Sequence, residues 1–331
     1  RPMNKFTFGI DVSHWQTNSA QSPQYFFDPF IAKDKGVQFA FIRASDGTRK
    51  DNAFDHFARE FNRAGIPWAP YHFLRPQSQY SYISQVDKFI EYISPYKFQL
   101  RPVLDVEADG LGLDLVRQWC GRLETKLGVK PIIYTAPNPW NTYRGVADAA
   151  WALEYDYWVA NYFSGLKWPV YDIPEIVLNS TSMPTQLQPW AKAGKPWKFW
   201  QFCAVGDGEF YGGNYAKHTD QAGLDMNVFN GSVEQFNAYF GLSDQPQEPE
   251  EPDEPEPLGQ VRVITRQSNG QPGWLLFRDT PDFYNGEVLA VGYGVVLQLL
   301  ESEPVNGLWH VKTPRGRVGY VSAGKAYTER I

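Results

Sequence analysis

Eight short apolar runs, which read as β-strands, occupy the first 230 or so residues of this 331-residue chain. Helical patterns separate several of them: apolar residues recur at helical spacing in 51–64, 84–93 and 114–127, and Gly65 and Gly128 supply two of the stops. Strands that alternate with helices indicate an α/β fold with a parallel sheet, and eight such strands predict a closed β/α barrel. Helices are not evident between the last three strands, so we expect an irregular barrel of about five βα units plus three β-strands. The predicted strands are residues 6–11, 38–44, 67–73, 102–107, 131–135, 157–162, 198–202 and 223–227.

Polar residues gather at the ends of these runs. In a β/α barrel, the loops that follow the strands converge on one mouth, and active sites form there. We therefore expect a functional site at the carboxyl ends of the strands. The residues at or near a strand end are Asp11, His72, Asp105, Glu107, Tyr134, Tyr162, Gln201 and Asp225.

The fourth strand turns abruptly acidic at Asp105 and Glu107. Side chains two residues apart on a strand share a face, so these two carboxyl groups repel each other, and one should hold its proton to a higher pH. A proton donor beside an ionised neighbour suits glycoside hydrolysis. A solvated strand end with two acids is the alternative interpretation of this short pattern.

The chain changes character after Leu242. Residues 242–258 are rich in Pro and Glu, a composition that cannot build a core and favours an extended, semi-rigid spacer. Residues 259–331 contain short strands with turn signals at 274–278, 294–300, 308–312 and 316–321, which predict a small all-β barrel. We therefore expect a catalytic β/α barrel over residues 1–241, the spacer, and a second domain.

Composition restricts the possible partners. The net charge of −6 and the absence of a basic cluster argue against nucleic acid. No apolar run is long enough for a membrane span, and no signal-peptide pattern is visible, although a chain that begins at Arg1 could have lost a leader. Cys120 and Cys203 belong to no metal-ligand pattern, and we expect free thiols. We expect a monomer.

The motifs of the first 230 residues together resemble glycoside hydrolase family 25, the N-acetylmuramidases or lysozymes of phage endolysins and bacterial autolysins. The segment Val311-Lys-Thr-Pro-x-Gly-x-Val-Gly-Tyr320-Val resembles a bacterial SH3-type cell-wall-binding domain. The family motifs are Gly9-Ile-Asp11-Val-Ser-x-Trp15, Tyr71-His72-Phe73, Leu104-Asp105-Val-Glu107, Tyr134-Thr, Trp158-x-Ala160-x-Tyr162, Trp200-Gln201 and Asp225-x-Asn227.

The resemblance implies catalytic roles for four acids. Glu107 would be the general acid that protonates the leaving oxygen, with Asp105 as its partner, and Asp11 and Asp225 would lie in the catalytic mouth. A D-x-E pair can serve substrate-assisted catalysis, in which the acetamide oxygen of the substrate attacks the anomeric carbon while an aspartate orients it. In the competing route an aspartate activates water, with inversion, and the sequence leaves the stereochemical outcome open.

The substrate-binding predictions concern seven further residues. Tyr134 and Gln201 are expected to hydrogen-bond the reacting sugar, and aromatic rings at the mouth can stack on sugar faces. The five histidines form no metal-binding pattern, so we expect no metal and no cofactor. The predicted substrate-binding residues are Trp15, Tyr71, His72, Tyr134, Trp158, Tyr162 and Gln201.

The resemblance implies a peptidoglycan hydrolase that cuts the bond between N-acetylmuramic acid and N-acetylglucosamine, held on the wall by residues 259–331. It would act on the bacterial cell wall after secretion or during phage lysis. One alternative is another acetamido-sugar hydrolase, a glucosaminidase or a chitinase-like barrel, but the longer acid series of chitinases fails here because residues 100 and 103 are Leu and Val. A non-catalytic wall-binding protein is disfavoured because all four acids are present.

Overall fold

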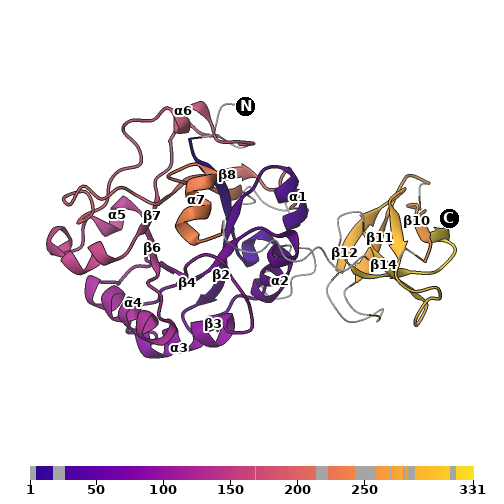
Figure 1. Ribbon diagram of the computed structural model, residues 1–331, viewed down its shortest axis with the longest axis horizontal. Helices are drawn as coiled ribbons and strands as arrows, with labels where there is room; N and C mark the ends of the chain where they lie inside the picture. The colour runs from indigo at the N-terminus through magenta and orange to yellow at the C-terminus, as the bar shows by residue number, and fades with distance from the viewer. Residues whose placement is uncertain are drawn as a thin grey trace. The chain divides into compact units, whose positions relative to one another are not determined.

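The chain forms two compact units, Arg1–Asp244 and Gln245–Ile331 (Figure 1). The computed structural model describes residues 5–17, 27–167, 169–213, 223–242, 258–268, 270–278, 281, 288–313 and 318–331. Most of the predicted spacer, residues 243–257, lies outside the described residues.

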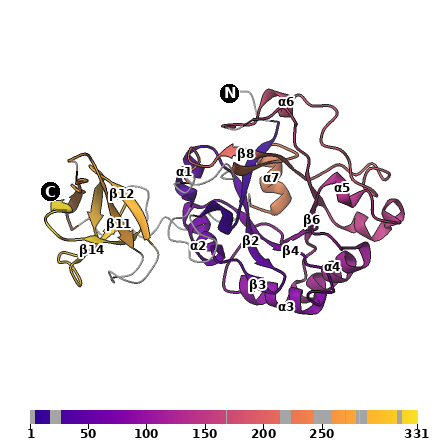
Figure 2. The same cartoon turned by 180° about the vertical axis from the view of Figure 1, so that it is seen from behind.

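The first unit contains a closed barrel of eight strands, which confirms the predicted architecture (Figures 1 and 2). Strand β1 pairs with β2 on one side and with β9 on the other, so the sheet has no open edge in this ring. A short ninth strand, β3 (Arg49–Lys50), pairs only with β2. The barrel strands are β1 (Thr7–Val12), β2 (Phe39–Asp46), β4 (Trp68–Phe73), β5 (Val103–Asp105), β6 (Ile132–Thr135), β7 (Tyr157–Ala160), β8 (Phe199–Asp207) and β9 (Gly223–Phe229).

The direction of β9 differs from the prediction of a parallel sheet. Strands β1, β2 and β4 to β8 are parallel to their neighbours in this series, whereas β9 is antiparallel to both β8 and β1. Antiparallel neighbours need no crossover helix, which explains why none was evident between the last two strands. As a result, the first residues of β9 lie at the same end of the barrel as the last residues of β1, and Asp225 pairs with Asp11.

The three predicted long helices form and pack around the outside of the barrel (Figures 1 and 2). Residues Phe54, Phe57 and Phe61 of α2 are fully buried, as the helical spacing predicted. Gly65 and Gly128 end α2 and α4 in the left-handed conformation, with φ of 63° and 71°. The helices are α1 (Pro29–Asp34), α2 (Phe54–Ala64), α3 (Tyr82–Ile93), α4 (Leu113–Leu127), α5 (Pro137–Trp140), α6 (Glu175–Leu178) and α7 (Val233–Phe240).

Aromatic side chains fill the barrel interior and close one end of it. The ring of Phe39 lies 5.3 Å from those of Phe199 and Phe236, and Phe236 belongs to α7, so this helix covers that end. Gly9 is required beside Phe39, because a Cβ at this position would lie 2.4 Å from the ring. The filled, covered end leaves the opposite end, where β1 to β8 terminate, for a site.

The second unit is an antiparallel sheet of seven strands, in the order β12-β11-β15-β14-β13-β10-β16. The four predicted strands are confirmed, but β10, β12 and β16 were not predicted. The core consists of alternate residues, among them Leu275, Phe277 and Val321. The strands are β10 (Gln260–Val263), β11 (Trp274–Arg278), β12 (Val288–Gly292), β13 (Val296–Leu299), β14 (Leu308–Lys312), β15 (Val318–Ser322) and β16 (Thr328–Arg330).

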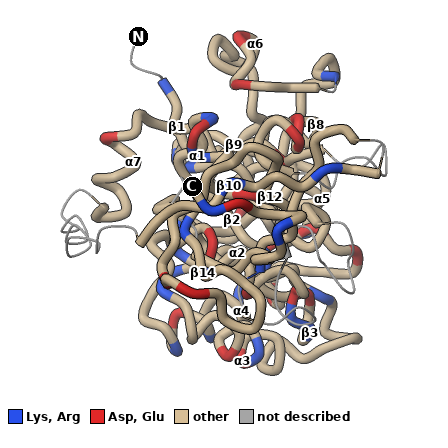
Figure 3. The backbone as a smooth tube through the Cα atoms, turned by 90° about the vertical axis from the view of Figure 1, so that its right-hand side faces the viewer, with Lys and Arg blue, Asp and Glu red and all other residues tan. Residues whose placement is uncertain are grey.

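Acidic and basic residues are interspersed along the backbone (Figure 3). None of the helices in the described ranges is long and apolar enough to cross a membrane.

Candidate functional site

A cavity of about 390 Å³ opens at the end of the barrel where β1 to β8 terminate. Every predicted site residue except His72 lines it, and so do residues that were not predicted, including Ser13, Gln16, Arg43 and Phe73. The predicted residues brought together here are Asp11, Trp15, Tyr71, Asp105, Glu107, Tyr134, Trp158, Tyr162, Gln201 and Asp225.

The alternation of side chains along each strand explains this convergence. Val103 contributes to the packed barrel interior, so Asp105, two residues later, faces the same way at the end of β5. Asp105 pairs with Tyr134 of β6 on one side and with Phe73 of β4 on the other. Glu107 follows the strand and is the more solvent-accessible of the two acids.

A hydrogen-bond network fixes Asp11 in the floor of the cavity. Its Oδ2 atom accepts hydrogen bonds of 2.8 Å from Gln201 Nε2 and from Asn227 Nδ2. Gln201 Oε1 in turn accepts from the hydroxyl groups of Tyr134, at 2.8 Å, and Tyr162, at 2.6 Å. These four bonds define the orientation of the Gln201 amide, because the reverse orientation would place its oxygen against the carboxylate.

The four carboxyl groups all hold their protons more strongly than free acids do. Burial is the largest cause in each case: it raises the pKa of Asp11 to about 6 and the pKa values of Asp105 and Asp225 well above the usual range. Repulsion from Glu107 raises the pKa of the other three acids further. Burial also raises the pKa of Glu107, against the opposing charge of Arg43. The cavity therefore favours protonated carboxyl groups, as a general acid requires.

Asp105 has an unused hydrogen-bond acceptor. The residue is only 4% exposed, and its Oδ1 atom has no hydrogen-bond partner within the described part of the chain. A buried acceptor without a donor lowers stability, and such an atom in a cavity is available to a bound molecule.

Arg43 was not predicted, although it is the single basic residue among the described residues that line the cavity. Its Nε atom donates a 2.8 Å hydrogen bond to Asp51 Oδ2, and Asp51 also accepts from the backbone N–H of His14 at 3.1 Å. The Asp51 carboxyl group is almost fully buried, which by itself would raise its pKa, but hydrogen bonds from the His14 side chain, the Ala53 backbone and Arg43, together with the charge of Arg43, bring the pKa below its usual value. A charged residue directly after the apolar run 39–42 was the available sequence signal.

Asn227 is the second residue that sequence reasoning left without a role, although it belongs to the motif Asp225-x-Asn227. It is fully buried and holds Asp11. Its position two residues from Asp225 on β9 was the signal, since both side chains face the barrel interior.

The aromatic residues of the cavity divide into rim and floor. Trp15 and Tyr162 are 63% and 47% exposed, so their ring surfaces are open to a ligand. Trp158 is buried, with its ring stacked on Phe41 at 4.2 Å and tilted against Tyr134 at 4.3 Å. Tyr71 and Tyr134 are also buried. Trp15 and Tyr162 are therefore the residues positioned for stacking, whereas Trp158 forms floor.

His72 does not belong to the site, contrary to the prediction. Its neighbour Tyr71 faces the cavity, so His72 faces the opposite side of β4, where it is fully buried. Its ring stacks on Trp119 of α4 at 5.2 Å, and its two nitrogens lie 2.8 Å from Ser45 Oγ and 3.1 Å from Gln85 Oε1. His72 is a residue of the packing between barrel and helices.

We expect His72→Gln to change stability rather than catalysis. Burial lowers the pKa of His72 to about 4, so between pH 6.5 and pH 4 the unfolded chain binds a proton that the folded chain does not. The wild-type protein therefore loses stability through His72 as the pH falls through this window, and the variant does not. In denaturant titrations the variant should be less stable than the wild type at pH 7, and this difference in unfolding free energy should narrow by about 3 kcal/mol at pH 4. A difference in stability that stays the same at both pH values, or a loss of activity in a variant that is as stable as the wild type, would contradict a packing role for His72.

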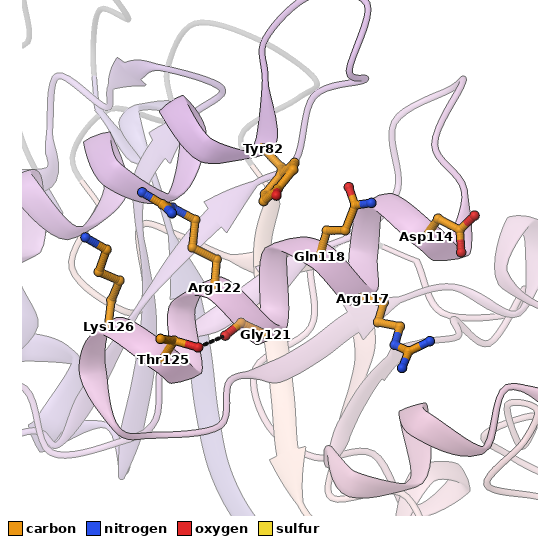
Figure 4. Close-up of a pocket in the computed structure, with 8 residues that line it drawn as sticks. All are labelled: Tyr82, Asp114, Arg117, Gln118, Gly121, Arg122, Thr125 and Lys126. Atoms are coloured by element: carbon orange, nitrogen blue, oxygen red, sulfur yellow. Dashed lines mark hydrogen bonds between the residues drawn. The ribbon is translucent and has the colours of Figure 1, made fainter.

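A second hollow lies on the outer face of α4, beside Tyr82 of α3 (Figure 4). Its lining includes the basic residues Arg117, Arg122 and Lys126, and Arg122 is already paired with Asp87 at 2.7 Å. It contains none of the predicted site residues, so the candidate site is the cavity at the barrel mouth.

Metal-ligand geometry is not found in the described ranges: no group of three or more His, Cys, Asp or Glu side chains is arranged to hold an ion.

Comparison with known proteins places this chain in a family. The profile of glycosyl hydrolases family 25 matches residues 10–209. Lysozyme M1 of Streptomyces globisporus is 29% identical over 246 residues, which are 70% of this chain and 70% of that protein. The uncharacterized protein YegX of Escherichia coli K12 is 28% identical over 258 residues, 74% of this chain and 78% of that protein.

Solved structures agree with the sequence comparison. The bacterial lysozyme of Streptomyces coelicolor superposes with a TM-score of 0.52 and 26% identity, over 72% of this chain and 98% of that one. The spore cortex lytic enzyme SleM of Clostridium perfringens covers 100% of this chain and 98% of its own, with a TM-score of 0.51; at 20% identity this likeness concerns the fold alone. The chain belongs to glycosyl hydrolase family 25 and is a glycoside hydrolase of the lysozyme class.

Proposed function

We propose that this protein hydrolyses the β-1,4 bond between N-acetylmuramic acid and N-acetylglucosamine in peptidoglycan, at the cavity of the barrel. One observation carries the proposal: an accessible acid with a raised pKa, Glu107, stands beside a buried carboxyl group with a free acceptor, Asp105. The open rings of Trp15 and Tyr162 at the rim supply surfaces for sugar rings.

Glu107 is proposed as the general acid. Its raised pKa keeps it protonated at a higher pH than a free glutamate, and its accessibility allows it to reach the glycosidic oxygen. As the bond breaks, the proton moves from Glu107 to the leaving oxygen, and Glu107 becomes a carboxylate.

Asp105 is proposed to orient the 2-acetamido group of the substrate. The free Oδ1 atom would accept the acetamide N–H, while the acetamide oxygen attacks the anomeric carbon and forms a cyclic, positively charged intermediate that the carboxylate stabilises. Water then attacks the anomeric carbon, gives its proton to Glu107 and restores the acetamide, with net retention. Deep burial fits this role better than activation of a water molecule by Asp105 with inversion.

Asp11 and Asp225 are proposed to organise the mouth. Asp11 holds Gln201, which in turn holds Tyr134 and Tyr162. Asp225 lies opposite Asp11 across the β1–β9 pair, and its raised pKa favours a protonated carboxyl group that can donate a hydrogen bond to the bound sugar.

The test is digestion of purified peptidoglycan. The proposal predicts that new reducing sugar ends appear while free amino groups stay constant, because glycosidic and not peptide bonds are cut. Release of amino groups without reducing ends would contradict it.

The second unit is proposed to be an SH3-type anchor for the wall, with residues 1–241 as the catalytic part. On β11, Trp274 is 63% exposed and faces solvent opposite Gly292, beside which the structure has open space. An exposed indole with a free face suits a wall polymer as a ligand. We propose that the monomeric protein acts at the bacterial cell wall after secretion or phage lysis.

Removing the second unit should separate anchoring from catalysis. Residues 1–244 form a compact unit, so we expect this fragment to digest soluble fragments within about twofold of the full chain but to lyse intact cells at least about tenfold more slowly. Circular dichroism establishes that the fragment is folded. Equal rates of cell lysis would remove the anchoring role.

A further inference from the structure

We propose that Arg43 is a positioning residue for the reaction: Asp51 and His14 clamp its guanidinium group so that a fixed positive charge stands among the cavity acids. The inference rests on the proposed function, because it concerns how those acids share their protons. It adds a cation to a site that was otherwise built from carboxyl and hydroxyl groups.

The strand places Arg43 above the packed interior of the barrel. Phe39 and Phe41 precede it at two-residue intervals on β2 and belong to the interior cluster, so Arg43 faces the same way one layer nearer the mouth. The register of β2 against β4 shifts between Arg43 and Ser45. Such bulges re-aim side chains beside active sites. After the shift, Ser45 bonds His72 on the outer side of the barrel.

The clamp is built around the buried carboxyl group of Asp51. The Oδ2 atom of Asp51 accepts hydrogen bonds from Arg43 Nε and from His14 Nδ1, each at 2.8 Å. Its Oδ1 atom accepts a hydrogen bond of 2.9 Å from the backbone N–H of Ala53, at the start of α2. The Nη2 atom of Arg43 lies against the His14 ring, and because Nδ1 of this ring donates its proton to Asp51, His14 confines the guanidinium group by packing and not by a hydrogen bond. With its side chain only 10% exposed, Arg43 has little freedom to leave.

The remaining titratable groups around Arg43 come from four strands and two loops. Asp11 lies on β1, Asp46 on β2, Tyr71 on β4 and Asp105 on β5, and Glu107 follows β5. Arg75, after β4, is a second cation near Glu107, but it is paired with Asp46 and does not line the cavity. Arg43 is thus the cation that acts on Asp11, Asp105 and Glu107 together.

The chemical consequence concerns which acid is ionised. Proton donation needs Glu107 protonated, while orienting a positively charged intermediate needs a carboxylate at Asp105. Burial favours the protonated form of each of the four acids, and repulsion from Glu107 adds to this for Asp11, Asp105 and Asp225. A fixed cation lowers the cost of one negative charge in the cavity, and so allows a mixed state of protonated and ionised groups.

The experiment compares Arg43→Met with Arg43→Lys in the full chain. For each, kcat/KM on solubilised peptidoglycan is measured from pH 3.5 to 8, and the aspartate carboxyl groups are titrated by NMR after selective ¹³C labelling. We expect Arg43→Met to move the ascending limb of the profile, and at least one aspartate midpoint, upward by about one pH unit. In Arg43→Lys, which keeps the positive charge, the ascending limb and the aspartate midpoint should both lie at their wild-type pH values. Arg117→Met, on the outer face of α4 (Figure 4), is the matched control and should leave both unchanged.

If Arg43→Met lowers the rate by one factor at every pH and leaves the NMR midpoints in place, the inference is wrong and Arg43 is only structural. If Arg43→Met does not fold, the double variant Arg43→Met/Asp51→Asn removes the unpaired carboxyl group with the cation, and the same shifts are expected. The NMR midpoints do not depend on the reaction. If the protein cleaves no glycosidic bond but the aspartate midpoints shift as expected, the proposed function is wrong while the electrostatic role of Arg43 is supported.

Discussion

Glu107→Gln is expected to reduce the hydrolysis of purified peptidoglycan by about 10²- to 10⁴-fold at every pH tested. The amide occupies the volume of the carboxyl group but has no proton to donate to the glycosidic oxygen. The fold should be unaffected, since Glu107 makes no hydrogen bond with the described part of the chain and stands at the accessible mouth. The measurement is the initial rate of reducing-end release.

Glu124→Gln is the matched control for this variant. Glu124 lies on α4, outside the cavity, and its carboxyl oxygen is 3.8 Å from Lys130 Nζ. The control should retain the wild-type rate, and both variants should unfold at the wild-type temperature. Full activity of a folded Glu107→Gln protein would remove Glu107 from the reaction.

Asp105→Asn is expected to lose activity and gain stability together. The carboxylate that orients the acetamide is gone, and we expect a loss of about 10²-fold or more. Burial raises the pKa of Asp105 in the folded protein above its unfolded value. The stability that its protonated form contributes is therefore lost as the pH rises through the folded pKa, and the amide avoids that loss.

Thermal unfolding at two pH values checks the sign of this effect on stability. At pH 7.5 the Asp105→Asn variant should be more stable than the wild type, with a melting temperature raised by about 2 °C or more. At pH 3, where the wild-type carboxyl group is protonated in both states, the difference should vanish. A variant that is less stable at pH 7.5, or equally stabilised at both, would contradict the assigned burial cost.

The sequence predicted the barrel because its periodic signals are local. Apolar runs and helical spacing, such as Phe54, Phe57 and Phe61 on α2, are read from neighbouring residues. The direction of β9 was not predictable in this way, because a strand has the same alternation in either direction. In the second unit, β16 has three residues, too few for a pattern.

In the candidate site, too, features that follow from local sequence were predictable, whereas features that depend on contacts between distant residues were not. The convergence of Asp11, Asp105 and Asp225 on one cavity was predictable because strand ends meet at the mouth. For Asp225 this holds only because the reversal of β9 brings its first residues there. The prediction that His72 binds substrate was wrong because successive side chains face opposite sides of a strand. Tyr71 faces the cavity, and His72, the next residue, therefore faces away from it. Arg43 was missed because its role depends on Asp51, whose contact no local pattern reveals.

The identity of the bond that is cut distinguishes a muramidase from a glucosaminidase. Peptidoglycan digested by the full-length protein is reduced with borohydride, and the new ends are identified by mass spectrometry. Cleavage between N-acetylmuramic acid and N-acetylglucosamine predicts reduced muramic acid at every new end. Reduced glucosamine ends would instead identify a glucosaminidase and contradict the account.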